Sequence, residues 1–311
     1  MANNKENTPQ VSEIEELRQK INALKGTADE SIKYINSELE STFVYNCNAL
    51  GGNKTSKETT KRIIKNGVQD GEKIELRHIL EITGLSEAYK KMQELAKNEK
   101  IQESDIEDLH KTLHSKIDPE TAGILQSSSD KINMGKEMRD FIFWFNTNDL
   151  DAISFATEAY VRYIFLHPYK GSNGRMARLI MNLAFLRRNF STVIIPNKWR
   201  KEYEKLINEY DEEEFTNFIK RCIYFSQNLV VNKQGNLYSE NKKRHIRGLN
   251  VEDDVMEYVK ENPGSKAVIV KQAFPKISFT KLQRIFRTLA QAGKIEFRGP
   301  TKTGGYFAIN E

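Results

Sequence analysis

The sequence predicts a mainly α-helical protein with a short pair of β-strands near its C-terminus. Apolar residues recur every three or four positions along most of the chain, which is the spacing of one helix face. Hydrophobic residues make up 38% and charged residues 29% of the 311 residues, a mixture typical of soluble helical proteins. Strand-like alternation occurs at residues 295–298 and 306–309, on either side of a glycine-rich turn.

The first hundred residues predict a tail followed by a helical region. Residues 1–10 are polar, and we expect them to be disordered. Residues 11–100 are charged and carry two apolar stripes at helical spacing. The stripes consist of Leu17, Ile21 and Leu24, and of Ile32, Ile35, Leu39 and Phe43. The run Gly-Gly-Asn at 51–53 predicts a helix end, because glycine and asparagine tolerate left-handed backbone. A further helix is expected from about residue 57, after a serine or threonine cap.

Residues 101–231 predict an all-helical core. Apolar residues at helical spacing, bounded by capping residues, mark each helix. The expected helices cover residues 104–114, 137–146, 151–166, 173–187, 198–210 and 213–230. The apolar run Val193-Ile194-Ile195-Pro196 interrupts this pattern as a short extended or buried segment.

The rest of the chain predicts a linker and a small separate domain. Residues 232–250 form a basic linker, and residues 251–311 contain three short helices followed by the strand pair. This order resembles a winged helix-turn-helix, in which the third helix enters the major groove of DNA and the hairpin contacts the backbone. The resemblance implies DNA contacts by Lys281, Arg284, Arg287 and Lys302. The alternatives are a solvated helix face and a protein-docking module.

One segment of the core indicates a chemistry. Residues 167–178 contain a histidine, a turn rich in Gly, Ser and Asn, and two arginines. A helix N-terminus directs N–H groups and partial positive charge at one point, so phosphate binds there. Arg175 and Arg178 are three residues apart and can clamp phosphate oxygens from one helix face. His167 places a base beside this phosphate site, which suggests transfer of a nucleotide or phosphoryl group to a hydroxyl.

The same segment resembles the signature of the Fic (Fic/DOC) family. That signature reads His-Pro-Phe, any residue, Asp or Glu, Gly-Asn-Gly-Arg, two residues, Arg. The positions that agree in order and spacing are His167, Pro168, Asn173, Gly174, Arg175 and Arg178. The resemblance implies a helical core with a short β-hairpin flap, for which the corresponding stretch is the polar segment 121–132. It also implies transfer of AMP from ATP to a Ser, Thr or Tyr hydroxyl of a target protein.

The resemblance further implies a role for each matching residue. His167 would be the general base for the target hydroxyl. Ser172, Asn173 and Gly174, through the backbone of the turn, would hold the α- and β-phosphates, with assistance from Arg175. Arg178 would pair with the γ-phosphate.

Two positions depart from the family pattern. The acid that binds Mg²⁺ in the family is Gly171 here, and glycine offers no side-chain ligand for a cation that prefers oxygen. An N-terminal inhibitory helix, in which a glutamate pairs with the second arginine of the motif, is matched near 47–53. Cys47 and Gly51 replace its Ser/Thr and its glutamate. These departures leave open a second function, in which a catalytically silent Fic scaffold acts as a DNA-binding regulator that senses a nucleotide or phosphate.

Composition bounds the remaining possibilities. A net charge of +5 does not by itself demand a nucleic-acid partner, and two cysteines provide neither a disulfide framework nor a metal cluster. His110 and His114 have a spacing that can bind a metal, but no third ligand is nearby in the sequence, so we expect no metal site. The chain has no apolar run typical of a signal peptide or membrane helix. We therefore expect a cytoplasmic protein with no membrane partner.

Overall fold

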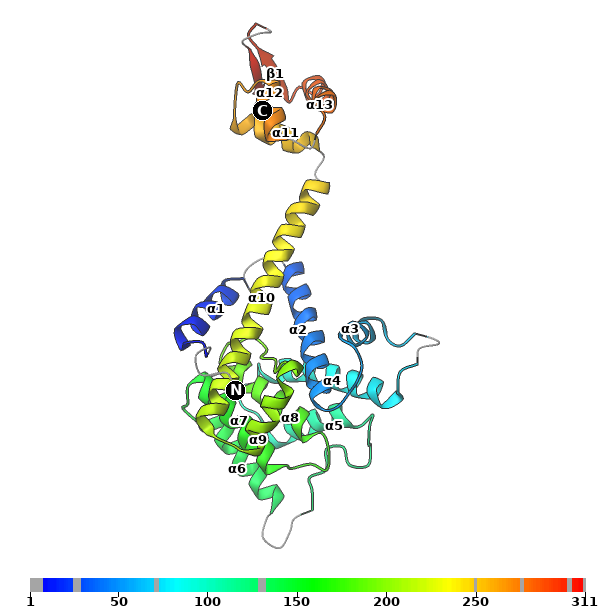
Figure 1. Cartoon of the computed structure of the whole chain (residues 1–311), viewed down its shortest axis with the longest axis vertical. Helices are drawn as coiled ribbons and strands as arrows, with labels where there is room; N and C mark the ends of the chain where they lie inside the picture. Colours follow the sequence, from blue (N-terminus) through cyan, green and yellow to red (C-terminus); the bar gives the residue numbers. More distant parts are fainter. Residues whose placement is uncertain are drawn as a thin grey trace. The chain divides into compact units, whose positions relative to one another are not determined.

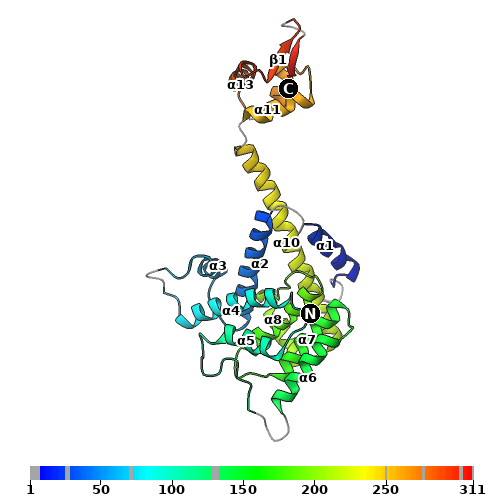
Figure 2. The same cartoon turned by 180° about the vertical axis from the view of Figure 1, so that it is seen from behind.

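The structure is a computed structural model that describes residues 8–24, 29–69, 73–127, 133–248, 251–274, 277–300 and 304–309. Helices dominate it, and the strands are confined to a two-stranded sheet in the part of the chain that is described (Figures 1 and 2). The mainly α fold predicted from the sequence is thus confirmed. The chain divides into two compact units, Met1–Gln234 and Gly235–Glu311.

The first unit consists of helices joined by short segments. The helices up to the candidate site are α1 (Val11–Leu24), α2 (Asp29–Leu50), α3 (Lys57–Asn66), α4 (Leu76–Leu95), α5 (Glu103–His114), α6 (Met134–Thr147) and α7 (Ala152–Leu166). The helices after the site are α8 (Asn173–Arg187), the 3₁₀ turn η2 (Asn197–Trp199), α9 (Arg200–Asn208) and α10 (Glu212–Gly248). Helix α10 continues beyond Gln234, where the first unit ends. Of the segment 1–10, residues 1–7 lie outside the described residues, and Pro9 is buried just before α1.

Local sequence explains where several of these helices begin and end. The Ser56 side chain accepts a hydrogen bond from the backbone N–H of Thr59 and caps α3. Asp151 accepts from two backbone N–H groups at the start of α7, at 2.9 and 3.2 Å. Such caps satisfy N–H groups that have no partner within the helix. Helix α2 ends at Leu50, and Gly52 just after it has a φ of +96°. The helix end predicted from the glycines at 51–53 is thus confirmed.

Helix α8 forms the centre of the first unit. Its apolar residues from Met176 to Phe185 are fully buried, because neighbouring helices cover it on all sides. Helix α7 packs alongside it. Asn182 of α8 accepts from the backbone N–H of Val193 at 2.7 Å and donates to the carbonyl of the same residue at 3.0 Å. This pairing explains how the extended segment after α8 can be buried without losing its backbone hydrogen bonds.

The segment expected to form a flap contacts the motif. Leu125 and Tyr169 form an isolated antiparallel bridge, and the N–H of Gln126 donates to the carbonyl of Pro168 at 2.8 Å. Residues 128–132 of this segment lie outside the described residues. The described part therefore reaches the turn by backbone pairing.

Helix α10 extends further than the sequence predicts. It was expected at 213–230, but it continues to Gly248 and includes most of the segment 232–250 that we expected to be a linker. No proline occurs between residues 212 and 248, so no residue in this run lacks the N–H that a helix requires. None of the helices in the described ranges is long and apolar enough to cross a lipid bilayer.

The second unit contains three helices and an antiparallel strand pair. The elements are α11 (Val251–Glu261), α12 (Ala267–Ala273), α13 (Phe279–Gln291), β1 (Ile295–Arg298) and β2 (Gly305–Ala308). The strands are paired from Ile295 with Ala308 to Arg298 with Gly305. Apolar residues of all three helices and β1 form one core, and the ring of Phe286 stacks on that of Tyr306 with 3.9 Å between centroids. The Ser278 side chain caps α13 by accepting a hydrogen bond from the backbone N–H of Lys281.

Candidate functional site

The turn between α7 and α8 is bounded by two residues with left-handed backbone. His167 ends α7 with φ 49° and ψ 54°, and Ser172 precedes α8 with φ 60° and ψ 9°. Non-glycine residues in this conformation each cost about 1–3 kcal/mol and are found where surrounding structure holds them. The turn is therefore a built feature, which places an exposed histidine next to the N-terminus of α8.

His167 is held by amide groups from two sides. The side-chain amide nitrogen of Gln126 lies 3.1 Å from its Nδ1 and also donates to the carbonyls of His167 and Tyr169, at 3.1 and 2.8 Å. The amide nitrogen of Asn173 lies 3.3 Å from Nδ1 and 3.2 Å from Nε2. Asn173 also accepts from the backbone N–H of Tyr169 at 3.2 Å. Gln126 is a site residue that the sequence analysis missed, because it comes from a polar segment without any motif.

The two arginines of the motif have different surroundings, although they share a helix. Arg175 donates from Nη2 to the Ser172 hydroxyl at 2.8 Å. Its Nη1 lies 3.5 Å from a carboxylate oxygen of Glu81 on α4 and makes no hydrogen bond within the described structure. Arg175 therefore contacts the turn with one guanidinium nitrogen and a carboxylate of α4 with the other.

Arg178 lies deeper and has only 4% of its surface exposed. Its guanidinium donates to the Cys47 sulfur at 3.1 Å, to the Cys47 carbonyl at 2.9 Å and to the Tyr203 hydroxyl at 2.9 Å. A phosphate that reached this arginine would have to replace these contacts. The spacing of Arg175 and Arg178 suggested that both bind the same phosphate oxygens. In the structure each guanidinium contacts a different set of residues.

The end of α2 lies against this second arginine. The carbonyl of Cys47, which accepts from Arg178, is 3.9 Å from the position that a Cβ atom would take at Gly51. A long side chain at Gly51 would therefore begin within reach of the guanidinium. The structure brings together the two positions that the family pattern pairs, but it has neither the glutamate nor the serine or threonine of that pattern.

Helix α5 contributes two histidines to the turn. His110 accepts the N–H of Gly123 at Nδ1, at 2.8 Å, and its Nε2 lies 3.1 Å from the Gly171 carbonyl. Its ring stacks on that of Tyr169, with centroids 3.9 Å apart. His114, one helical turn later, lies 2.8 Å from the Ser172 hydroxyl through its Nδ1. The spacing of four residues was the visible signal in the sequence, where it only allowed a metal site that we did not expect. The structure uses both rings to hold the turn.

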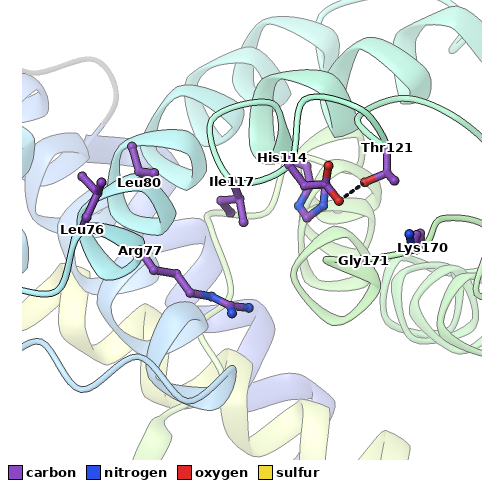
Figure 3. A pocket seen from close by; sticks show the side chains of 9 residues that line it. Leu76, Arg77, Leu80, His114, Ile117, Thr121, Lys170 and Gly171 are labelled. Atoms are coloured by element: carbon purple, nitrogen blue, oxygen red, sulfur yellow. Dashed lines mark hydrogen bonds between the residues drawn. The ribbon is translucent and has the colours of Figure 1, made fainter.

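A pocket of about 540 Å³ opens beside Gly171. Figure 3 shows the His114 ring close to Gly171, and Arg77 extending into the same region from α4. Lys170, Asp118 and three apolar side chains complete much of its lining. Within the described residues, no group of three His, Cys, Asp or Glu side chains is placed to hold a metal ion.

The buried state of His110 predicts a measurable dependence of stability on pH. Burial lowers the pKa of His110 from 6.5 to about 4. Between these values the unfolded chain binds a proton that the native chain does not, so the free energy of unfolding should fall as pH decreases from 6.5 to 4, by up to about 3 kcal/mol. Denaturant unfolding across this range should show a flatter profile for His110→Gln than for the natural chain. Parallel profiles would mean that another group causes the loss.

The basic residues expected to contact DNA are exposed where they are described. Lys281, Arg284 and Arg287 lie on the outer face of α13, while Leu282 and Ile285 point into the core of the second unit. Lys302 lies outside the described residues.

Comparison with known proteins shows which family the segment around the site resembles. Residues 100–185 match the Fic/DOC family. A protein adenylyltransferase Fic of Nematostella vectensis is 31% identical over 196 residues, which are 58% of this chain and 46% of that protein. Protein adenylyltransferase fic-1 of Caenorhabditis elegans is 28% identical over 63% of this chain and 42% of its own length. The chain thus spans about half the length of the curated relatives it matches.

Solved structures agree on the fold. Fic-1 from C. elegans superposes with a TM-score of 0.64 at 26% identity, over 71% of this chain and 70% of that chain. A Fic family protein from Desulfovibrio desulfuricans G20 superposes with a TM-score of 0.55 at 16% identity, over 97% of this chain and 95% of that chain. The second likeness concerns the fold alone.

Proposed function

We propose that this chain, a Fic family protein whose matching domain covers residues 100–185, transfers AMP from ATP to a hydroxyl group of a target protein. The observation that carries the proposal is the exposed His167 beside the N-terminus of α8, in a chain similar to protein adenylyltransferases. ATP or a related nucleotide and a protein with an accessible Ser, Thr or Tyr are the partners that this reaction requires.

The turn and α8 provide the phosphate site of this proposal. The first N–H groups of α8, at Asn173, Gly174 and Arg175, have no partner within the helix and carry its partial positive charge. Arg175 adds the positive charge of its guanidinium at the start of α8, where its Nη2 donates to the Ser172 hydroxyl. Anionic oxygens of the α- and β-phosphates are suited to such a set of donors.

The proposed reaction is a nucleotidyl transfer. A neutral imidazole has one unprotonated nitrogen, and His167 would use it to accept the proton of the target hydroxyl. The hydroxyl oxygen forms a bond to the α-phosphorus, and the bond from this phosphorus to the β-bridging oxygen breaks. AMP remains on the target, and pyrophosphate leaves with the bridging oxygen. Gln126 and Asn173 would fix the ring for this step.

The residues at the turn do not fit the Mg²⁺ that the family pattern implies. The acid's position holds Gly171, and the Gly171 carbonyl lies 3.1 Å from Nε2 of His110. Mg²⁺ requires oxygen ligands in nearly octahedral geometry. The side chains at the turn therefore supply no ligand that would place Mg²⁺ for this reaction.

The position of the isotope label in ATP tests this function. We expect incubation of the full chain with ATP labelled at the α-phosphorus to label the chain itself or an added protein, with release of pyrophosphate. ATP labelled at the γ-phosphorus should leave the protein unlabelled. Label from the γ-phosphorus would instead identify a phosphotransferase, and absence of label from both would contradict catalysis by this chain on the proteins supplied.

The second unit favours an additional candidate function, the binding of duplex DNA through a winged helix. The observation in its favour is the exposed basic stripe Lys281, Arg284 and Arg287 on the third helix of a unit that ends in a strand pair. This function would belong to a DNA-binding regulator, with or without activity at the turn.

Salt dependence provides the test of DNA binding. For each phosphate contact, the association constant should fall by about one log unit when the salt concentration rises by one log unit. In the full chain, Arg284→Gln with Arg287→Gln should lower the affinity for duplex DNA and flatten this slope. Lys97→Gln with Lys100→Gln removes the same charge from exposed positions in the first unit and is the matched control. Equal effects of the two pairs would contradict a specific role of α13.

A further inference from the structure

The position of the missing acid is already occupied. A Cβ atom added to Gly171 would lie 2.9 Å from Cε1 and 3.0 Å from Nε2 of His114. These distances are shorter than ordinary van der Waals contact between carbon atoms. No side chain can start from residue 171 while this ring stays in place, so His114 excludes the carboxylate of the family pattern.

The hydrogen bonds around Ser172 determine which nitrogen of His114 carries the proton. Arg175 can only donate, so the Ser172 hydroxyl accepts from its Nη2 at 2.8 Å. The hydroxyl proton is then directed to Nδ1 of His114, also at 2.8 Å. A neutral imidazole that accepts at Nδ1 carries its proton at Nε2. Burial, followed by the charge of Arg175, lowers the pKa of His114, which agrees with a neutral ring.

The other oxygen atoms at this position are engaged as well. His110 accepts the N–H of Gly123 at Nδ1, so its protonated Nε2 donates to the Gly171 carbonyl. The Ser172 hydroxyl is shared between Arg175 and His114. The family pattern has a negative oxygen at this place, whereas this chain has an N–H donor at Nε2 of His114 and oxygens that already have partners.

This change reverses the polarity of the site. A carboxylate repels phosphate unless a cation lies between them, whereas an imidazole N–H can donate to a phosphate oxygen directly. Lys170 and Arg77 line the same pocket and add positive charge, although Arg77 also lies 3.5 Å from Glu81, and Asp118 lines the pocket as well. A polyphosphate can therefore find direct donors where the family pattern provides a metal ligand.

We propose that this site binds the polyphosphate of its nucleotide without a divalent cation, and that His114 donates from Nε2 to a phosphate oxygen in place of the metal. The identity of the ligand as ATP rests on the proposed function. The direct contact makes His114 a binding residue, and its bond to Ser172 fixes the orientation of the ring.

Calorimetric titration of the full chain with ATP, in EDTA and in excess Mg²⁺, tests the proposal. We expect the two dissociation constants to agree within a few-fold. An affinity in EDTA more than about tenfold weaker than in Mg²⁺, or no binding under both conditions, would overturn it.

Substitutions at two positions assign the effect to His114. His114→Leu should weaken binding in EDTA by about tenfold or more, as expected when a hydrogen bond to a charged group is lost. His114→Gln retains an N–H donor and should recover much of the affinity. Gly171→Asp with His114→Ala restores the acid together with the space that it needs, and this variant should require Mg²⁺. Equal affinities of the Leu and Gln variants in EDTA, or a double variant indifferent to Mg²⁺, would contradict the role of His114.

These measurements separate the proposal from the proposed function. Binding in EDTA without any transfer of label would support cation-free binding and contradict AMP transfer. Transfer and binding that both require Mg²⁺ would support AMP transfer and overturn cation-free binding.

Discussion

Replacement of His167 by alanine should lower the rate of AMP transfer by about 10²–10⁴-fold, the usual contribution of a general base. The imidazole is exposed beside the start of α8 and is oriented by the amides of Gln126 and Asn173. The methyl group of alanine cannot accept the proton of the target hydroxyl. Incorporation of label from the α-phosphorus of ATP into protein, followed over time, measures the fall in the rate of transfer.

The affinity for ATP serves as the control for this variant. The phosphate donors of the proposal belong to the turn and to α8, so His167→Ala should bind ATP nearly as well as the natural chain. A variant that binds ATP and still transfers AMP at the natural rate would contradict the assignment of His167 as the base.

A glutamate at Gly51 should inhibit the protein. The new side chain would begin 3.9 Å from the Cys47 carbonyl, to which Arg178 already donates at 2.9 Å. Its carboxylate could pair with Arg178 and oppose a bound phosphate through like charge. We expect about tenfold or greater loss of ATP affinity, the effect of one charge-assisted hydrogen bond, in a calorimetric titration.

Gly51→Gln is the matched control for this prediction. Glutamine has the same length and the same branching but no charge, and both side chains meet the Asn48 carbonyl at 3.2 Å from their Cβ atoms. The control therefore reports the steric cost alone. Equal losses from Glu and Gln would show that crowding at the end of α2, and not pairing with Arg178, weakens binding.

Local signals in the sequence predicted the helices well because their causes are local. Ser56 and Asp151 cap helices by contacts to backbone N–H groups two or three residues away. The end of α2 is followed by Gly52, which adopts a positive φ. The sequence prediction ends α10 too early, because the polar composition after residue 231 favours a linker, although the run contains no proline to stop a helix.

The site was predictable only where it is contiguous in the sequence. The motif gave the position of His167 and the turn, but the burial of Arg178 depends on Cys47, a residue 131 positions earlier. The role of His114 depends on Ser172, 58 residues later. Periodicity can show that two histidines share a helix face, but it cannot show which distant segment that face contacts.

The position of the turn at the start of α8 has a consequence for thermal stability. Helix α8 continues from the turn through the fully buried centre of the first unit, so the turn is anchored at its C-terminal end in that core. A ligand bound there favours the native state by mass action and raises the melting temperature as its concentration exceeds the dissociation constant. Thermal denaturation thus becomes a means of screening nucleotides against this chain, even for those that it binds without converting.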